Sequence, residues 1–131
     1  MDAGARAVEA RTLDLNERGS LRETSHHGTH LNFQGTTSGT IRGAMYIHLD
    51  VTSQNQVSAE VSIYPSNGSL TGSSVASYRA VGGQATFSGT MSISRGTGAY
   101  AHAHASSLSF SGTIQRINDD TTVRLSGSLS Y

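Results

Sequence analysis

The feature that most constrains the fold is a strict alternation of apolar and hydroxyl side chains from residue 87 to residue 94. Phe87, Met91 and Ile93 share one parity with Gly89, and every position between them is Ser or Thr. Successive side chains of an extended strand point to opposite faces, whereas a helix would scatter these residues around its axis. The segment therefore predicts a β-strand with one apolar face and one hydroxyl face.

The same alternation recurs along the chain. It predicts a hairpin from Met45–Val51 and Val57–Ile63, a weaker strand over Leu70–Tyr78 and a last strand that ends at Tyr131. Turn residues separate these segments, as in Pro-Ser-Asn-Gly at positions 65–68. We expect the following side chains to be mostly buried: Met45, Ile47, Leu49, Val51, Val57, Val61, Ile63, Phe87, Met91, Ile93, Leu108, Phe110, Ile114, Val123, Leu125 and Leu129.

The beginning of the chain is less regular. We expect a loose N-terminal segment over residues 1–6, a first strand over Ala7–Leu15 and a turn at Asn16–Ser20. The stretch Leu21–Thr29 shows little periodicity. The whole chain of 131 residues has the length of one domain, residues 1–131.

This pattern predicts an all-β protein with about eight or nine short strands and no helix. An antiparallel β-barrel of about eight strands and a β-sandwich both accommodate such a chain. Gly89, Gly112 and Gly127 fall inside strands on the apolar parity. Glycines at such places ease crowding and allow strands to bend inside a small barrel, so we favour the barrel.

Composition excludes several functions. Nine arginines balance nine acidic residues, so the chain has no electrostatic footprint for nucleic acid. Cysteine and lysine are absent, which removes thiol catalysis, disulfides and lysine Schiff bases. No apolar run approaches roughly 18 residues, so we expect no membrane insertion. Nothing in the sequence indicates a cofactor.

The first candidate site is a row made of Tyr100, His102 and His104, which follows a predicted turn at Gly96–Gly98. Two imidazoles and a phenol on one strand face are suited to general acid–base catalysis. If a strand runs unbroken from Tyr100 to Ile114, both histidines share the apolar face. A bulge near residues 105–107 would turn them to the other face, as a polar row toward solvent or another subunit.

Two other clusters are weaker candidates. One cluster consists of three histidines close together in the sequence: His26, His27 and His30. A metal site requires three or four convergent ligands. The other interpretation is a polar surface loop, and we predict no metal. Tyr46, His48 and Asp50, with Glu60 across the hairpin, pair imidazole with carboxylate. Their parity is opposite to the apolar one, which favours a solvated sheet face or a contact in a trimer.

Two sets of residues carry a resemblance. The segment from Gly96 to Ala101, Gly-Thr-Gly-Ala-Tyr-Ala, resembles the Gly-[ST]-Gly-x-[YF] turn of the allene oxide cyclase and dirigent barrels. Three longer stretches are similar to small, secreted actinobacterial proteins labelled autotransporter-like: Leu31–Gly43, Ile47–Pro65 and Phe87–Gln115. The likeness to this group spans residues 11–131.

The resemblance implies an eight-stranded barrel, often trimeric, with an apolar lumen in which the enzymes of the superfamily steer the cyclisation of reactive intermediates. No catalytic residue of those enzymes matches a position of this chain. The resemblance also implies a secreted protein, and the start Met-Asp-Ala-Gly-Ala-Arg-Ala, which is not a signal peptide, could follow a cleavage site. A cytoplasmic location is the alternative.

Two functional hypotheses follow. The first is a β-barrel that binds an apolar small molecule in its lumen, as a cyclase or isomerase if it is an enzyme; Phe87, Met91, Leu108 and Phe110 would line the ligand site. The second is a non-catalytic secreted structural or adhesion module, favoured by hydroxyl-rich faces and by the absence of acidic residues from the predicted core. A lumen packed with side chains would distinguish the two, because it leaves no room for a substrate.

Overall fold

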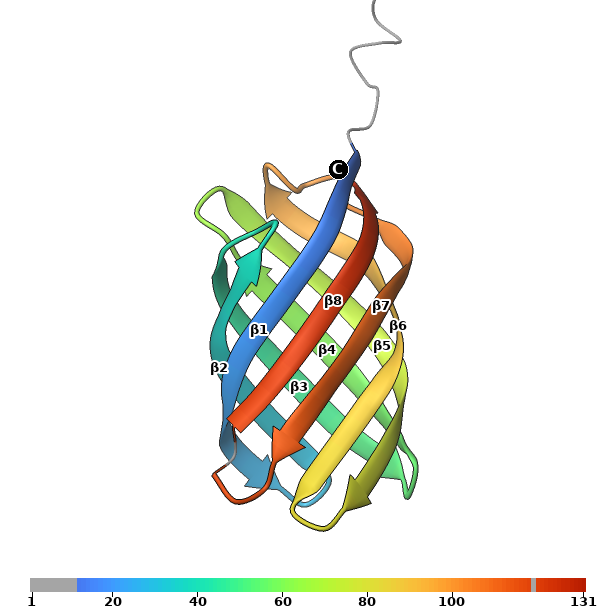
Figure 1. Cartoon of the computed structure of the whole chain (residues 1–131). Coiled ribbons are helices and arrows are strands. Elements are labelled where there is room, and N and C mark those ends of the chain that lie inside the picture. Colours follow the sequence, from blue (N-terminus) through green and yellow to red (C-terminus); the bar gives the residue numbers. More distant parts are fainter. Residues whose placement is uncertain (1–11, 119) are drawn as a thin grey trace, which may run out of the picture.

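The computed structural model describes residues 12–118 and 120–131. Each strand pairs antiparallel with the next along the chain and the last pairs with the first, so the sheet closes into an up-and-down barrel (Figure 1). The predicted all-β barrel is confirmed, and the alternative β-sandwich is wrong. The predicted loose segment 1–6 lies outside the described residues. The eight strands are β1 (Thr12–His27), β2 (His30–Gly39), β3 (Gly43–Ser53), β4 (Gln56–Tyr64), β5 (Gly68–Val81), β6 (Gln84–Gly98), β7 (Ala105–Gln115) and β8 (Asp120–Ser130).

Most local expectations are met. The predicted hairpin is β3 and β4, and the turns at Pro65–Asn67 and at the Gly82-Gly83 pair separate β4 from β5 and β5 from β6. Of the sixteen side chains expected in the core, fifteen are buried, and Val51 is partly buried against the same cluster. The period of two therefore identifies the inner side of nearly every strand.

The first strand differs from the expectation. The predicted turn at Asn16–Ser20 is wrong, because β1 runs unbroken through these positions. Gly19 in the middle of this segment pairs with Thr37 of β2 on one side and with Val123 of β8 on the other. Hydrogen-bonded partners on both sides hold the segment extended and override its local preference for a turn.

The segment between β6 and β7 also differs. A strand beginning at Tyr100 is wrong, since Tyr100 lies in a double turn in which its N–H donates to the carbonyl of Thr97 and its carbonyl accepts from Ala103. Strand β7 begins only at Ala105. The carbonyl oxygen of Tyr100 comes within 2.0 Å of where a Cβ on Gly96 would stand, so a side chain there would block the turn.

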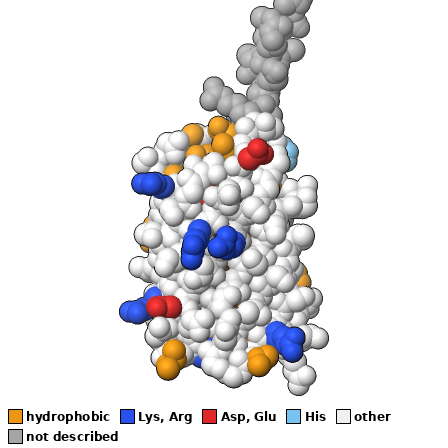
Figure 2. Space-filling view, viewed as in Figure 1, with side chains coloured by type: hydrophobic (Ala, Val, Ile, Leu, Met, Phe, Trp, Pro, Cys, Tyr) orange, Lys and Arg blue, Asp and Glu red, His pale blue; other side chains and the backbone are white. Residues whose placement is uncertain are grey.

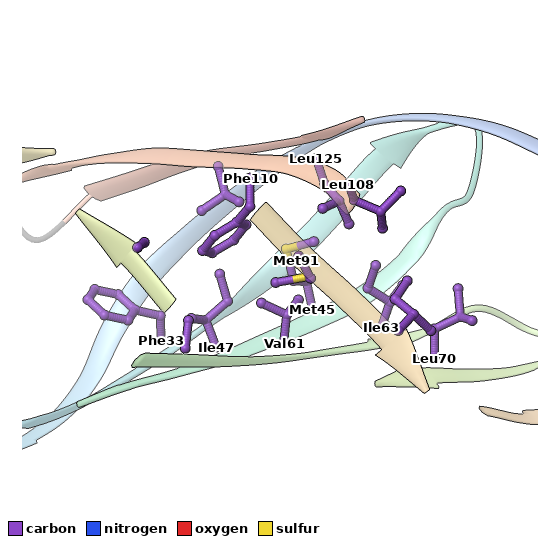
Figure 3. Close-up of a cluster of buried hydrophobic side chains, with 14 of the residues drawn as sticks. Phe33, Met45, Ile47, Val61, Ile63, Leu70, Met91, Leu108, Phe110 and Leu125 are labelled. Atoms are coloured by element: carbon purple, nitrogen blue, oxygen red, sulfur yellow. The ribbon is translucent and has the colours of Figure 1, made fainter. Parts of the chain in front are cut away.

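The barrel interior is filled by large side chains that lie over glycines. A Cβ on Gly112 would be 2.2 Å from the ring of Phe87, its cross-strand partner, and one on Gly127 would be 2.7 Å from the side chain of Leu108. The ring of Phe87 in turn packs on that of Phe110 at a centroid distance of 5.3 Å. Figure 3 shows Phe110 and other core side chains meeting inside the barrel. Glycine thus makes room for aromatic rings, as its place on the apolar parity suggests.

Candidate functional site

The four residues predicted to line a ligand site do gather inside the barrel. Phe87, Met91, Leu108 and Phe110 come from the adjacent strands β6 and β7, and Met91 lies opposite Leu108. Their side chains are only 2%, 1%, 0% and 1% exposed. A cavity large enough for a ligand would leave surface on its lining that a water molecule could touch. These side chains therefore contact one another and their neighbours in place of an open space.

Several hollows between the described residues lie on the outside of the barrel. Five grooves or dimples of about 270 to 570 Å³ are lined mainly by outward side chains, such as Ser88, Thr113, His48 and Tyr64. Ligand sites are normally concave surfaces that a small molecule can enter. Candidate binding surfaces are therefore found on the wall of the barrel.

One acid was missed by the sequence analysis. Glu17 points into the barrel and is 2% exposed, so the expectation of a core without acidic residues is wrong. The Thr37 hydroxyl donates to one carboxyl oxygen (2.8 Å), and the backbone N–H of Ile41 donates to the other (2.6 Å). The signal was present in the sequence, because Leu13, Leu15, Glu17 and Leu21 share one parity. The turn predicted at Asn16–Ser20 interrupted this alternation, so Glu17 was not assigned to the core.

The surroundings of Glu17 decide what it can do. Burial raises the pKa of its carboxyl above the usual 4.5, while hydrogen bonds from Ile41, Thr37 and Thr40 oppose this shift. Both oxygens already accept hydrogen bonds from the chain, and the residue is only 2% exposed. Glu17 therefore ties the β2–β3 connection to the barrel, where Ile41 packs into the core.

The candidate catalytic row does not form. Between Met91 and Ile93 of β6, the facing strand β7 carries one residue more, from Leu108 to Ala105, which is the bulge that the sequence analysis considered. His102 and His104 are accordingly exposed, while Ala103 and Ala105 between and after them are buried. Tyr100 is buried elsewhere, against the ring of Tyr131 at 5.4 Å.

The weak metal candidate is not assembled either. The Nε2–H of His26 donates to the carbonyl of Gly28 in its own turn (2.8 Å), while His30 faces Asp50 across the β2–β3 pair. Across residues 12–118 and 120–131 no three His, Asp or Glu side chains are arranged to hold a metal ion. Nor does that part of the chain contain a helix long and apolar enough to cross a membrane.

One side of the barrel wall, formed by β2–β4, has polar groups that are bonded to one another. The ring of His48 stacks on that of His30 at 5.6 Å, and its Nδ1 lies 2.6 Å from the side-chain oxygen of Asn32. Glu60 faces Arg95 of β6 at 3.7 Å. As expected, these side chains lie on the outside of the sheet. We call this surface the histidine face, made of His30, Asn32, Tyr46, His48, Asp50, Glu60 and Tyr64.

The other side of the wall is built differently. Two rows of outward residues cross β5, β6, β7, β8 and β1, and in both rows serine and threonine predominate. Figure 2 shows this side as mostly neutral and polar, with basic side chains next to each other near its middle. We call it the hydroxyl face; its two rows are Ser77–Ser88–Ser111–Arg124–Arg18 and Arg79–Thr86–Thr113–Thr122–Ser20.

Two arginines stand directly opposite each other on the hydroxyl face. Arg18 of β1 and Arg124 of β8 are cross-strand partners, and both are exposed. Within the described part of the chain, neither has an ion pair or a side-chain hydrogen bond, whereas nearby Arg22 pairs with Asp120 at 3.3 Å. Directly opposed like charges are destabilising, so this pair is a feature that packing does not explain.

Comparison of the chain with protein-family models, with curated proteins and with solved structures finds no match. The resemblance to the allene oxide cyclase and dirigent barrels and to secreted actinobacterial proteins stays a prediction. What the structure defines is a class by shape: a closed, antiparallel, eight-stranded barrel with a filled interior.

Proposed function

We propose that this protein is a non-catalytic binding module that presents a rigid barrel wall to its ligand and leaves the lumen unused. The observation that carries the proposal is the filled interior: the four side chains expected to line a lumen site, Phe87, Met91, Leu108 and Phe110, are at most 2% exposed. An enzyme that cyclises an apolar intermediate needs a space in which the intermediate can bind.

The polar groups of the interior agree with this proposal. The carboxyl group of Glu17 is engaged by the chain itself, and the two candidate histidines are on the outside. The outer wall, in contrast, offers grooves that are open to solvent and rich in hydroxyl groups. A module for adhesion or for binding to a surface needs such a wall and a stable core behind it.

The test is a titration with apolar probes, benzene and decanoic acid, followed by NMR of the backbone amides. We expect no saturable shifts of lumen residues in the natural chain. The matched control is Phe110→Ala, which removes a ring from the interior and opens a cavity of the kind that admits benzene. If that variant does not fold, Met91→Ala, with a smaller deletion, takes its place.

Saturable binding of either probe inside the natural barrel would overturn the proposal. It would reinstate the small-molecule hypothesis, with Phe87 and Phe110 as ligand contacts. Binding of benzene by the cavity variant alone would support the proposal, because it shows that the probe enters when space exists.

The expected homotrimer stays a prediction beside this function. The many small side chains of the chain would allow the sheets of neighbouring barrels to approach closely, and the balanced charge offers no repulsion. Light scattering at high protein concentration measures the assembly, and a mass near the 13.7 kDa of one chain would contradict it.

A further inference from the structure

The hydroxyl face carries a groove with positive charge at both of its ends. The groove has a volume of about 550 Å³ and crosses from β5 to β8. Arg79 of β5 borders one side and Arg124 of β8 the other, with Arg18 directly beyond Arg124. Since neighbouring strands lie about 4.8 Å apart, the two sides are separated by roughly 14 Å along the wall. The hydroxyl groups between them come from Ser77, Ser88, Ser111, Thr86, Thr113 and Thr122.

We propose that this groove binds an acidic oligosaccharide, with a carboxylate or sulfate group on the Arg18–Arg124 pair and with sugar hydroxyls against the serine and threonine rows. The proposal rests on the proposed function, since it names a ligand class for the outer wall. It extends that function by placing the ligand on one defined face of the barrel.

The opposed arginines are the first argument. The Cβ atoms of directly opposite residues lie about 5 Å apart, so the two guanidinium groups can converge on one oxyanion. A guanidinium group offers its N–H donors in a planar fork that matches a carboxylate or a sulfate. A bound anion would also relieve the repulsion between Arg18 and Arg124, and no acidic side chain in the described residues forms an ion pair with either of them.

The hydroxyl rows are the second argument. Each serine or threonine hydroxyl can donate one hydrogen bond and accept two, which is also the capacity of a sugar hydroxyl. The groove is elongated across four strands, so it fits a short chain of sugars better than a single inorganic ion. None of the residues that line the groove is Asp or Glu, so no negative charge in the lining opposes an acidic ligand.

A nucleic acid fits the groove less well. Proteins that bind single strands stack the bases on exposed aromatic rings. Of the two aromatic residues at the groove, Phe87 is 2% exposed with its ring in the core, and Tyr78 is partly buried against the core. The balanced charge of the whole chain gives no broad basic surface either.

The experiment is an NMR titration of the full chain at low ionic strength. The probes are an oligouronate, a sulfated gluco-oligosaccharide, the neutral gluco-oligosaccharide of the same length, sodium sulfate and a single-stranded oligodeoxynucleotide. We expect saturable shifts at Arg18, Ser111, Thr113 and Arg124 with one or both acidic oligosaccharides. The two acidic arms tell whether the carboxylate or the sulfate is preferred.

Matched charge variants locate the site. Arg124→Gln removes one of the two opposed guanidinium groups and should weaken the binding of the preferred oligosaccharide about tenfold or more, the usual effect of losing a hydrogen bond to a charged group. Arg42→Gln removes the same charge from an exposed position on the β2–β3 connection, outside the groove, and should leave the affinity unchanged. Added salt should weaken binding to the natural chain more than to Arg124→Gln.

Four results would each overturn the proposal: equal binding of the neutral oligosaccharide, equal binding of sulfate alone, equal binding of the oligodeoxynucleotide, or equal effects of Arg42→Gln and Arg124→Gln. These failures are distinct from a failure of the proposed function. If no oligosaccharide binds while the lumen still excludes benzene, the glycan site is wrong and the outer wall keeps its function.

Discussion

The two sides of strand β6 differ in burial and in chemistry. On the inner side Phe87, Met91 and Ile93 are at most 3% exposed and pack against residues from other strands. On the outer side of the same strand, Ser88 and Thr90 are exposed and belong to the surface that includes the hydroxyl face. The same backbone thus carries the core and a polar surface, one residue apart.

This difference indicates where the chain can change and where it cannot. Interior positions are constrained by volume, since a Cβ on Gly112 would stand only 2.2 Å from the ring of Phe87. Outer positions are less constrained by packing, and few of those described take part in an ion pair such as that of Arg22 with Asp120. Substitutions on the two sides should therefore separate stability from binding.

The largest effect is expected from truncating a ring in the interior. Phe110→Ala deletes a side chain that is 1% exposed and packs on the ring of Phe87. It should lower the free energy of unfolding by about 3–5 kcal/mol, measured by urea denaturation. The outer neighbour in the sequence, Ser111→Ala, is the matched control. A loss below about 1 kcal/mol for Phe110→Ala would mean that the interior is looser than it looks and would weaken the contrast between the two sides.

A smaller loss is expected from filling the space beneath a ring. Gly112→Ala places a Cβ 2.2 Å from the ring of Phe87, so the ring or the strand must move. Overpacking of this kind costs about 1–3 kcal/mol. Gly83→Ala adds the same methyl group in the β5–β6 turn, where nothing lies within 4 Å, and should be tolerated. Equal thermal stability of the two variants would contradict the close fit of Phe87 over Gly112.

The buried acid makes stability depend on pH. Because burial raises the folded pKa of Glu17 above 4.5, the folded state favours the protonated carboxyl. The stabilisation from this group is therefore complete below pH 4.5 and is lost as pH rises through the raised pKa. When protonated, Glu17 can donate to the Thr37 hydroxyl, which can then donate to the Arg18 carbonyl, 3.4 Å away.

Glu17→Gln tests this sign. The amide keeps an acceptor for Ile41 and a donor for Thr37 but cannot ionise. Its free energy of unfolding should gain on that of the natural chain as pH rises from below 4.5 to neutrality. Glu17→Ala, which leaves the Ile41 N–H without its acceptor, should lose about 1–3 kcal/mol at all pH values. If the free energy of unfolding of Glu17→Gln instead falls relative to that of the natural chain as pH rises, the hydrogen bonds lower the pKa of Glu17.

The fold could be predicted from the sequence because most strands are exposed on one side only, which makes the period of two visible. The site could not be predicted as well. The position of His102 and His104 depended on one extra residue near Ser106, which alternation alone does not locate. The burial of Glu17 was not predicted because the residues around it have a local preference for a turn. Pairing with β2 on one side and β8 on the other decides the conformation instead.

The hydroxyl face raises a different difficulty. Arg18 and Arg124 are 106 positions apart in the chain and become neighbours only because β8 closes the barrel against β1. Nothing in either local sequence marks them as a pair. Their pairing could be predicted only from the register between the first and the last strand.

The smallest effect is expected from this arginine pair, on stability alone. Arg124→Gln removes the repulsion between two exposed guanidinium groups, so it should raise the free energy of unfolding by a few tenths of a kcal/mol at low ionic strength. Salt screens exposed charges, and the gain should vanish as the Debye length falls to roughly 3 Å in molar salt. Arg22→Gln is the control with opposite sign, because Arg22 pairs with Asp120 and its loss should cost a comparable small amount. Urea denaturation of the three chains at two salt concentrations measures all of these changes. If Arg124→Gln destabilises the barrel as Arg22→Gln does, Arg124 has a stabilising partner on the wall, and the hydroxyl face is less free for a ligand than its open groove indicates.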